Sequence, residues 1–437
     1  MQISSAESFA ENDTVTASGT AKLKPTFAFH FQGWKRPIFE RYFPDRKFTF
    51  VPMYVSEHAF RKIWMPLIRA EETPEIFVWN LGLPEGLRAF ARENGIPLFL
   101  VEDGFLRSLE PNATRTPPLS LTLDSGALYF DSRNPSDMEV LLSSYDFEGD
   151  PGLMERARNG IRLLLDTGIS KYNTDGRSDV HALYGEKRGK RVLVVGQVED
   201  DASIKLGCDQ PFTNNDLVRL AAQENPGAQI IYKPHPDVLN GVRLAQSRPA
   251  DVAHLCTIID APLTMAKAFE SVDHVYTITS LAGFEAVLRG LKVTVRGAPF
   301  YAGWGLTDDR QPTPRRARKL SVEALFAAAY LLYPRYFDPA TGAARSFEET
   351  VHAIHARLAK PREPSRKSAG KVAWQPIGPY GILGWRHLLT PFIAPIVASI
   401  GHPIDAETFR QNPIEFFREL PQRKYRLIGR IIYPFGA

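Results

Sequence analysis

The stretch TITSLAGFEAVLRGLKVTVRGAPFYAGWGLTDD, residues 277–309, decides the fold class. It begins as a strand, and Thr279 and Ser280 follow where a helix start favours a side-chain acceptor. Helical spacing then predicts a short helix that ends at Gly290, a second strand, and a loop rich in glycine and aromatic residues. A helix that begins directly after a strand presents free N–H groups and a positive dipole end, which suit an anion.

The segment YKPHPDV, residues 232–238, carries matching cations. Lys233 and His235 follow an apolar run that predicts a strand, and the flanking prolines favour an extended backbone. A lone histidine is more often structural than functional, but its pairing with the helix start above favours function. Two strand ends with cations and amide donors predict a nucleotide phosphate site.

Strand and helix patterns alternate along the chain, which is typical of parallel β/α units. Strands are expected at 26–31, 76–79, 97–101, 191–195, 230–232, 275–277 and 293–296, with helices at 84–93 and 321–333. We therefore place two Rossmann-like halves at 25–185 and 186–335, a disordered tail at 1–24, and C-terminal helices at 336–437. Residues 307–320 have the composition of a basic linker.

Length and composition limit the class of protein. The 437 residues are 44% hydrophobic and 23% charged, enough for two domains with large cores. The net charge of +4 is spread among acidic residues, so nucleic acid is not an expected partner. Two cysteines fit a reducing compartment, and neither a leader nor a spanning segment is expected, so a cytoplasmic protein is predicted.

Two acidic clusters follow predicted strands. Glu102 and Asp103 precede a glycine, and Glu199, Asp200 and Asp201 stand in GQVEDDAS. Such carboxylates suit a base or a nucleophile at a sugar carbon. The structural alternatives, a solvated turn for the first cluster and a helix cap for the second, stay open.

No metal or cofactor is expected. Metal-dependent glycosyl transfer would require spaced carboxylates, whereas Asp308 and Asp309 are adjacent. A cation and a helix end would instead neutralise a leaving phosphate.

Seven motifs together resemble one family, the capsule β-Kdo transferases of the KpsC/LipB type, over about residues 25–355. They are VEDGFLRS, PPLSLTLDSGALYFD, SKYN, GQVEDDASI, YKPHPDV, TSLAGFEAVLRG and PFYAGWGLTDD. The resemblance implies a GT-B fold, in which two Rossmann-like domains face a cleft, with a C-terminal helical extension here. KpsC-type proteins often carry two such modules, and the motifs occur once in this chain.

The resemblance also implies the reaction and its residues. β-Kdo would pass from CMP-Kdo, with retention, to a Kdo-containing glycolipid linker during capsule polysaccharide biosynthesis and export. Asp201 would be the nucleophile, with Asp200 as its rival, and Glu102 or Asp103 the acid/base partner. Substrate-binding positions would be Gln197, Ser203, Lys233, His235, Pro236, Ser280, Leu281, Ala282 and Glu285.

Two alternatives to this function remain. The motifs are also similar to those of bacterial sialyltransferases, so an inverting transfer from CMP-sialic acid is one. A non-catalytic capsule assembly or export protein is the other.

The tail after residue 370 is aromatic and basic. Such a mixture is typical of a helix on a membrane surface, which would lie at the inner face of the inner membrane, and equally of a packed helix pair. Its residues are Trp374, Trp385, Phe392, Phe416, Phe417, Arg423, Lys424, Arg426, Arg430 and Tyr433.

Overall fold

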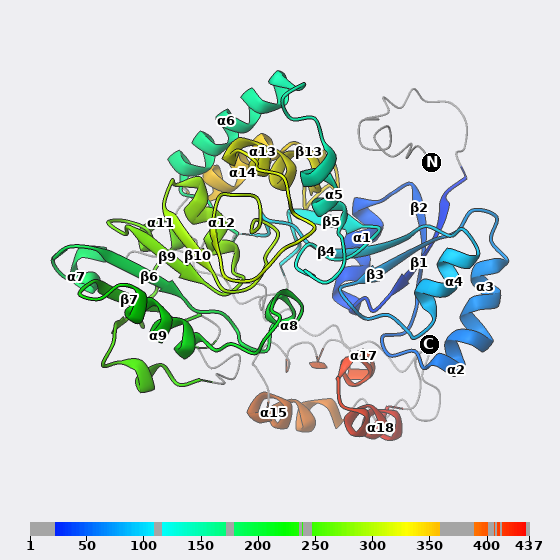
Figure 1. Ribbon diagram of the computed structural model, residues 1–437. Coiled ribbons are helices and arrows are strands. Elements are labelled where there is room, and N and C mark those ends of the chain that lie inside the picture. Colours follow the sequence, from blue (N-terminus) through cyan, green and yellow to red (C-terminus); the bar gives the residue numbers. More distant parts are fainter. Residues whose placement is uncertain are drawn as a thin grey trace.

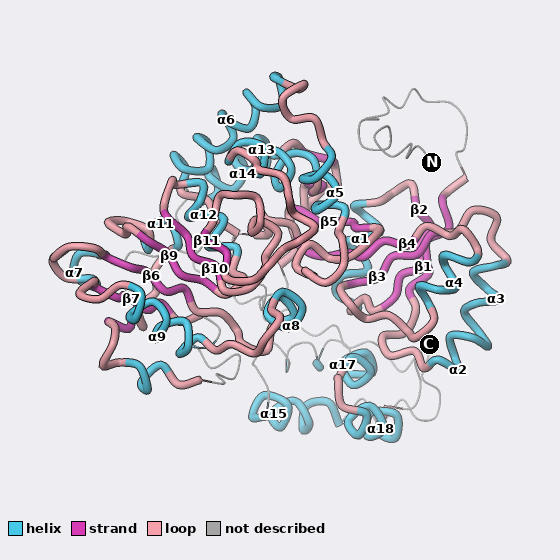
Figure 2. The backbone as a smooth tube through the Cα atoms, viewed as in Figure 1, coloured by secondary structure: helices cyan, strands magenta, loops and turns pink. Residues whose placement is uncertain are grey.

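The computed structural model describes residues 22–108, 116–171, 179–235, 238, 247–358, 389–400, 406, 409–410 and 413–433. Within them the chain forms two β-sheets, each accompanied by helices (Figure 1, Figure 2). The predicted α/β architecture with two Rossmann-like halves is confirmed. The expected tail lies, up to residue 21, outside the described residues.

The first sheet has seven strands in the order β13-β12-β5-β4-β3-β1-β2. Strands β2, β1, β3 and β4 run parallel, and the other three pair antiparallel. The strands are β1 (Lys24–Phe29), β2 (Arg46–Phe50), β3 (Glu75–Trp79), β4 (Leu98–Asp103), β5 (Ser120–Asp124), β12 (Pro334–Phe337) and β13 (Ala344–Arg345). The associated helices are α1 (Arg36–Tyr42), α2 (Glu57–Ala59), α3 (Met65–Arg69), α4 (Leu87–Glu93), α5 (Asp137–Ser144) and α6 (Pro151–Thr167).

The second sheet has six parallel strands in the order β11-β10-β9-β6-β7-β8. All five residues of its central strand, RVLVV, are buried, as expected for a parallel strand covered on both faces. The strands are β6 (Arg191–Val195), β7 (Gln229–Lys233), β8 (Thr257–Ile258), β9 (His274–Thr277), β10 (Lys292–Val295) and β11 (Asp308–Asp309). Its helices are α7 (Val180–Tyr184), α8 (Ala202–Gly207), α9 (Asn214–Glu224), α11 (Met265–Ala268) and α12 (Leu281–Leu288).

The chain returns to the first sheet after the second is complete. Helix α13 (Val322–Phe326) continues as a π-helical segment, Ala327–Leu332, which confirms the helical stretch predicted there. Strands β12 and β13 then extend the first sheet beyond residue 335, where the expected boundary of the second half was placed. Helix α14 (Phe347–Leu358) follows and packs on α6.

The segment 307–320 is not a linker, contrary to the composition-based expectation. Arg315 and Arg316 both pair with Glu139 of α5, at 2.6 and 2.9 Å. Arg316 is buried and also donates to the carbonyls of Pro299 and Ala302. Buried ion pairing therefore ties this basic segment to the helices of the first half.

Both sheets reverse their strand order near the middle, which fixes where a ligand binds. The order changes between β1 and β3 in the first sheet and between β6 and β9 in the second. Open parallel sheets bind ligands outside the carboxyl ends of strands at such switch points. The loops after β3, β6 and β9 therefore carry the candidate site.

The C-terminal helices are α15 (Thr390–Ile400), α17 (Pro413–Glu419) and α18 (Arg423–Ile432). They share a small core that includes Ala394, Phe409, Phe417 and Tyr433. Trp374 and Trp385 lie outside the described residues. Among the described helices, none has both the length and the apolar character needed to cross a bilayer.

Candidate active site between the two sheets

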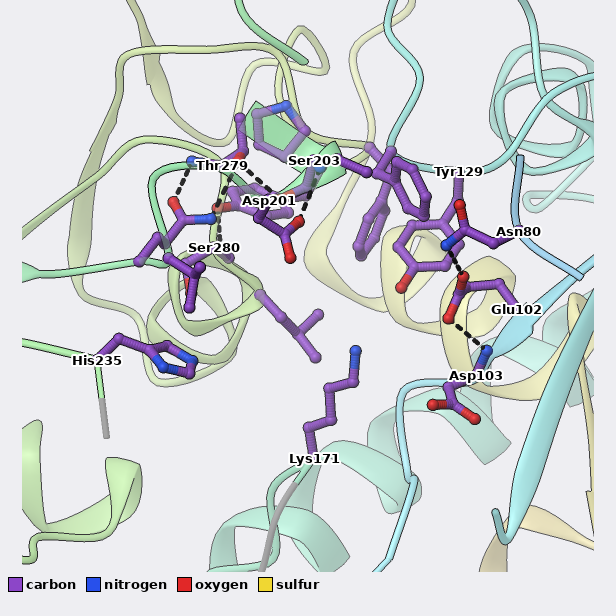
Figure 3. Close-up of a pocket in the computed structure, with 18 residues that line it drawn as sticks. Asn80, Glu102, Asp103, Tyr129, Lys171, Asp201, Ser203, His235, Thr279 and Ser280 are labelled. Carbon is purple, nitrogen blue, oxygen red and sulfur yellow. Dashed lines mark hydrogen bonds between the residues drawn. The ribbon is translucent and has the colours of Figure 1, made fainter. Parts of the chain in front are cut away.

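A cavity of about 330 Å³ lies where the carboxyl-end loops of the two sheets meet (Figure 3). One wall comes from the loops after β3, β4 and β5, and the other from the loops after β6, β7, β9 and β10. The cavity brings together most of the residues that the sequence singled out. Those that line it are Glu102, Asp103, Gln197, Asp201, Ser203, His235, Ser280 and Leu281.

Glu102 is held on the first wall by two donors. Asn80 Nδ2 donates to its Oε2 at 2.5 Å, and the Asp103 N–H donates to its Oε1 at 3.0 Å. Asn80 is itself fixed because its Oδ1 accepts from the Leu81 N–H. Burial, and after it the neighbouring Asp103 carboxylate, raise the pKa of Glu102 above its ordinary value.

Asp103 has a different environment from its neighbour. Its Oδ2 accepts from Arg107 Nε at 2.8 Å, and the guanidinium of Arg107 is fully buried. Arg107 also donates to Ser108 Oγ and the Thr116 carbonyl. Burial alone would raise the pKa of Asp103, but positive charges, with Lys35 the largest contributor, lower it. Asp103 is therefore an ionised partner that holds Arg107 and its loop.

Lys35 is a buried charged residue whose charge acts on Asp103 and Glu102, and it was not identified from the sequence. It is buried, and its Nζ lies 3.2 Å from the ring centroid of Trp79, the last residue of β3. Burial lowers the pKa of Lys35 to about 8, although Asp103 and Glu102 oppose this shift. The sequence signal that could have identified Lys35 is its position in GWK, between a strand and a helix.

The second wall is organised by Gln197, directly after β6. Its Oε1 accepts from the Thr279 N–H at 2.7 Å, and its Nε2 donates to Thr279 Oγ1 at 3.1 Å. This amide therefore joins the ends of β6 and β9 across the switch point. The result is a fixed distance between the acidic cluster after β6 and the helix start after β9.

The carboxylates of the second cluster have different surroundings. Glu199 is buried and accepts from the Asn214 N–H at 2.7 Å and the Ser247 N–H at 2.8 Å. Asp201 caps α8, because its Oδ1 accepts from the Ser203 N–H at 2.8 Å. Asp201 lines the cavity and Asp200 is not among the lining residues (Figure 3). The predicted helix cap is confirmed, and the capping residue also faces the cavity.

The helix start after β9 has the predicted form. Ser280 is the N-cap of α12 and its Oγ accepts from the Ala282 N–H at 3.2 Å, so Ala282 gives its amide to the cap. The Tyr301 hydroxyl donates to the Ser280 carbonyl. A Cβ at Gly283 would lie 2.2 Å from the Tyr301 hydroxyl oxygen, so this contact requires glycine.

The remaining predicted binding residues lie at different depths. His235 lines the cavity, whereas Pro236 lies outside the described residues. Lys233 is buried, is not a lining residue, and has its pKa lowered by burial. Glu285 is also buried and away from the lining; burial raises its pKa to about 7.

Lys171 also lines the cavity. No role was assigned to it from the sequence, although it belongs to the motif SKYN. Its ammonium group points into the cavity between the two walls (Figure 3). Its charge opposes the rise in the pKa values of Glu102 and Glu285, and it adds to the effect of Lys35 and Arg107 in lowering the pKa of Asp103. Tyr172 and Asn173 of the motif lie outside the described residues.

The arrangement suits a substrate that carries negative charge. Carboxylates face the cavity from both walls, while His235, Lys171 and a helix start supply donors and positive charge. Within the described ranges, no group of three or more histidine, cysteine and acidic side chains is arranged to hold a metal ion.

Two solved structures are similar to this fold. The KpsC β-Kdo 2,4 transferase of Thermosulfurimonas dismutans aligns with a TM-score of 0.63 and 32% identity, over 76% of this chain and 98% of that chain. The β-Kdo 2,7 transferase of the same KpsC aligns with a TM-score of 0.60 and 31% identity, over 77% and 100%. The GT-B-like architecture implied by the motifs is thereby confirmed.

Sequence relatives agree with this likeness. The lipopolysaccharide-processing protein LpsZ of Rhizobium meliloti is 48% identical over 75% of this chain and 73% of its own length. The capsule polysaccharide modification protein LipA of Neisseria meningitidis serogroup A is 38% identical, and the match spans 44% of its length. The profile described as "Capsule polysaccharide biosynthesis protein" matches residues 84–161 and 157–336. Because that profile matches more than half of the chain, with the whole second sheet and most of the residues that line the cavity, the chain belongs to the capsule polysaccharide biosynthesis family.

Proposed function

We propose that this protein is a retaining glycosyltransferase that moves β-Kdo from CMP-Kdo to a Kdo-containing glycolipid linker in capsule polysaccharide biosynthesis. The observation that carries the proposal is that Asp201 and Glu102 line one cavity from opposite sheets. The similarity to two KpsC β-Kdo transferases, at TM-scores of 0.60 and 0.63, supports the same reaction class. We do not assign the linkage to the acceptor, because the two similar transferases are described as 2,7 and 2,4 transferases.

The first step is a displacement at the anomeric carbon of the donor. A carboxylate oxygen of Asp201 bonds to this carbon as its bond to the phosphate oxygen breaks, and CMP leaves with the electron pair. The Ser203 N–H fixes the carboxylate at the start of α8, and its position on the cavity wall favours this role over Asp200. The product is a sugar ester of Asp201.

The second step transfers the sugar to the acceptor. An acceptor hydroxyl attacks the same carbon, the ester bond to Asp201 breaks, and Glu102 takes the hydroxyl proton. Two displacements on opposite faces return the original configuration. A raised pKa suits Glu102 to this role, since a base is most effective when its pKa lies near the working pH.

The leaving phosphate requires positive charge and donors. His235, the Ser280 hydroxyl and the backbone at Leu281 line the cavity on the same wall as Asp201 and would hold CMP. Lys171 lies between the walls, where its ammonium group would pair with the carboxylate of the sugar or with the phosphate. A single phosphate leaving group is neutralised by such a set, so the proposed reaction uses no metal or cofactor.

The proposed acceptor also suggests where the enzyme works. A lipid-linked saccharide is presented at a membrane surface, and a CMP-sugar donor is a cytoplasmic compound. We therefore place the reaction at the cytoplasmic face of the inner membrane. The free thiols of Cys208 and Cys256 are consistent with a reducing compartment.

The deciding experiment is intact-mass measurement of the protein after incubation with CMP-Kdo without acceptor. The proposal expects CMP release and a protein species heavier by one Kdo residue, which peptide mapping locates at Asp201. CMP-sialic acid serves as the parallel donor. If no protein-bound species forms, yet sugar is transferred once acceptor is added, the two-step mechanism is contradicted and an inverting transferase is favoured.

A further inference from the structure

Helix α15 exposes one apolar side. Phe392, Ile396 and Ile400 recur every fourth residue, so they share a helix face, and they are 75%, 55% and 79% exposed. On the opposite side Ala394 is buried in the small core of the C-terminal helices. The exposed side chains therefore do not contribute to the core that packs this helix.

Helix α18 exposes a similar side beside it. Leu427, Ile428 and Ile431 are 47%, 43% and 72% exposed, whereas Gly429 packs against Phe417. The two helices are joined where Thr390 Oγ1 and the Tyr433 hydroxyl lie 3.2 Å apart, and Figure 1 shows them next to each other. We call these six exposed apolar residues of α15 and α18 the apolar face.

Positive charge flanks the apolar face. The sequence of α18, RKYRLIGRII, contains four basic residues and no acidic one. Arg423, Lys424 and Arg430 are exposed on it. Of the aromatic residues noted in the tail, Phe416, Phe417 and Tyr433 are buried in its core and Phe392 is exposed. The packed-helix alternative therefore holds for the buried residues, and the membrane-surface alternative can concern only the exposed ones.

The helices are fastened to the edge of the first sheet that carries Glu102. The Gly33 N–H donates to Glu419 Oε1 at 2.6 Å, and Arg36 pairs with Glu415 at 3.1 Å. The guanidinium of Arg426 stacks on the Tyr54 ring at 4.3 Å. Gly33 follows β1, whose carboxyl end lies beside that of β3, where Asn80 orients Glu102.

We propose that the apolar face with its flanking cations is a docking surface for a bilayer of anionic lipids. Scattered exposed apolar residues are ordinary, but six on two adjacent helices, spaced so that each helix exposes one apolar side, are typical of an interaction site. Apolar side chains on one side of a helix, with arginine and lysine beside them, match the boundary between acyl chains and anionic headgroups. A protein partner would not require this basic excess.

Membrane docking rests on the proposed function, because the proposed acceptor is a glycolipid, but it can be tested without measuring sugar transfer. Docking would bring the cavity wall that carries Glu102, the proposed base for the acceptor hydroxyl, towards the surface that presents a glycolipid. Vesicle binding is measurable without any sugar donor, and CMP release is measurable without any vesicle. Failure of one result therefore leaves the other interpretable.

The experiment is co-sedimentation of the full chain with two kinds of vesicle. One kind is phosphatidylcholine alone, and the other contains about 30% phosphatidylglycerol, an anionic lipid that attracts basic side chains at the membrane surface. We expect strong binding to the anionic vesicles and weak binding to the neutral ones. The variant F392S/I396S/I400S should bind anionic vesicles about 100-fold more weakly, through lost apolar burial. The variant R423Q/K424Q/R430Q should lose a similar factor, about 100-fold, and with it the preference for anionic lipid.

The matched control is V140S/L165S. Val140 of α5 and Leu165 of α6 are 51% and 37% exposed and lie far from α15 and α18 (Figure 1). This control should bind like the wild type. All variants should keep the unfolding transition and the CMP release of the wild type, since the substituted side chains are exposed.

Three results would overturn the proposal. The first is wild-type protein that stays in the supernatant with both vesicle types. The second is an α15 variant that sediments like the wild type. The third is a wild-type dimer that F392S/I396S/I400S converts to a monomer in analytical ultracentrifugation, which would assign the apolar face to a second copy of the chain.

Discussion

The two acidic clusters of this protein have similar sequences and similar places in their sheets. VEDG ends β4 of the first sheet, and GQVEDDAS follows β6 of the second. In each, one carboxylate serves the fold: Asp103 holds the buried Arg107, and Glu199 accepts from two backbone N–H groups. In each, another, Glu102 or Asp201, faces the shared cavity.

The clusters differ in what surrounds the cavity-facing carboxylate. Glu102 accepts hydrogen bonds on both oxygens, and burial, followed by the neighbouring Asp103 carboxylate, raises its pKa. Asp201 gives one oxygen to the Ser203 N–H, and the other faces the cavity in Figure 3. The first environment suits proton transfer and the second suits bond formation to carbon. The burial and the contacts of each carboxylate thus separate the proposed roles.

The largest effect is expected from removing the nucleophile of the second cluster. Asp201→Asn should lower the rate of transfer by about 10,000-fold, the scale of losing a nucleophile. Asparagine is as good a helix cap as aspartate, so α8 should stay intact. The measurement is CMP release together with intact mass, which should show no sugar on the protein.

Asp200→Asn is the matched control for this prediction. Asp200 stands next to Asp201 but does not line the cavity. Its variant should keep transfer within a few-fold of wild type and should still form the protein-bound sugar. The reverse outcome, an inactive Asp200 variant and an active Asp201 variant, would exchange the two assignments.

A second prediction tests the structural half of the first cluster. Asp103→Asn removes the carboxylate charge that pairs with the fully buried Arg107 and should lower the free energy of unfolding by about 3–5 kcal/mol. Urea denaturation measures this difference. The matched change Glu102→Gln should cost less than about 1.5 kcal/mol, because Glu102 lacks a buried cation bound to it. Equal losses in both variants would refute the division of roles.

A third prediction tests the catalytic half. Glu102→Gln should slow transfer to acceptor about 100-fold, the lower end for loss of a general base. The first displacement does not need this base, so the sugar ester on the protein should accumulate. Intact mass during turnover would reveal it. A variant that forms no ester would place Glu102 in the first step instead.

The same assignment predicts a pH dependence. A base must be deprotonated, so the transfer step should slow as the pH falls through the raised pKa of Glu102. Because this pKa is raised, the decline should begin at a higher pH than for an ordinary glutamate. Glu102→Gln should flatten this limb in single-turnover kinetics. A limb that persists in the variant would belong to another group.

Most of the second sheet could be predicted from the sequence, since four of its six strands, β6, β7, β9 and β10, are largely buried runs. Residues 191–195 form β6 as predicted, and Ser280 caps α12. The return of β12 and β13 to the first sheet could not be predicted, because the pairing of β12 with β5 joins residues far apart in sequence. Likewise, the burial of Arg316 depends on Glu139, which only the folded chain brings near.

The candidate site could be predicted to the level of segments but not of atoms. Strand-end position identified both clusters and His235, since carboxyl ends of parallel strands meet at one edge. Loop geometry decides which carboxylate pairs with an arginine or accepts hydrogen bonds from backbone amides, and no local sequence pattern encodes that geometry. Asn80 and Lys171 were missed for a related reason: each acts by reaching a group on a different segment.

The smallest effect extends the comparison to the two cations of YKPHPDV. His235 lines the cavity, whereas Lys233, two residues earlier on β7, is buried away from the lining. His235→Ala should weaken CMP binding about 10-fold, the value of one charge-assisted hydrogen bond. Lys233→Met keeps the apolar stem and should change CMP affinity less than about twofold, since a contact outside the cavity adds little to binding. Titration calorimetry with CMP measures both. A larger loss in the lysine variant would mean that its ammonium group reaches the phosphate after all, and the anion site would then extend below the cavity wall.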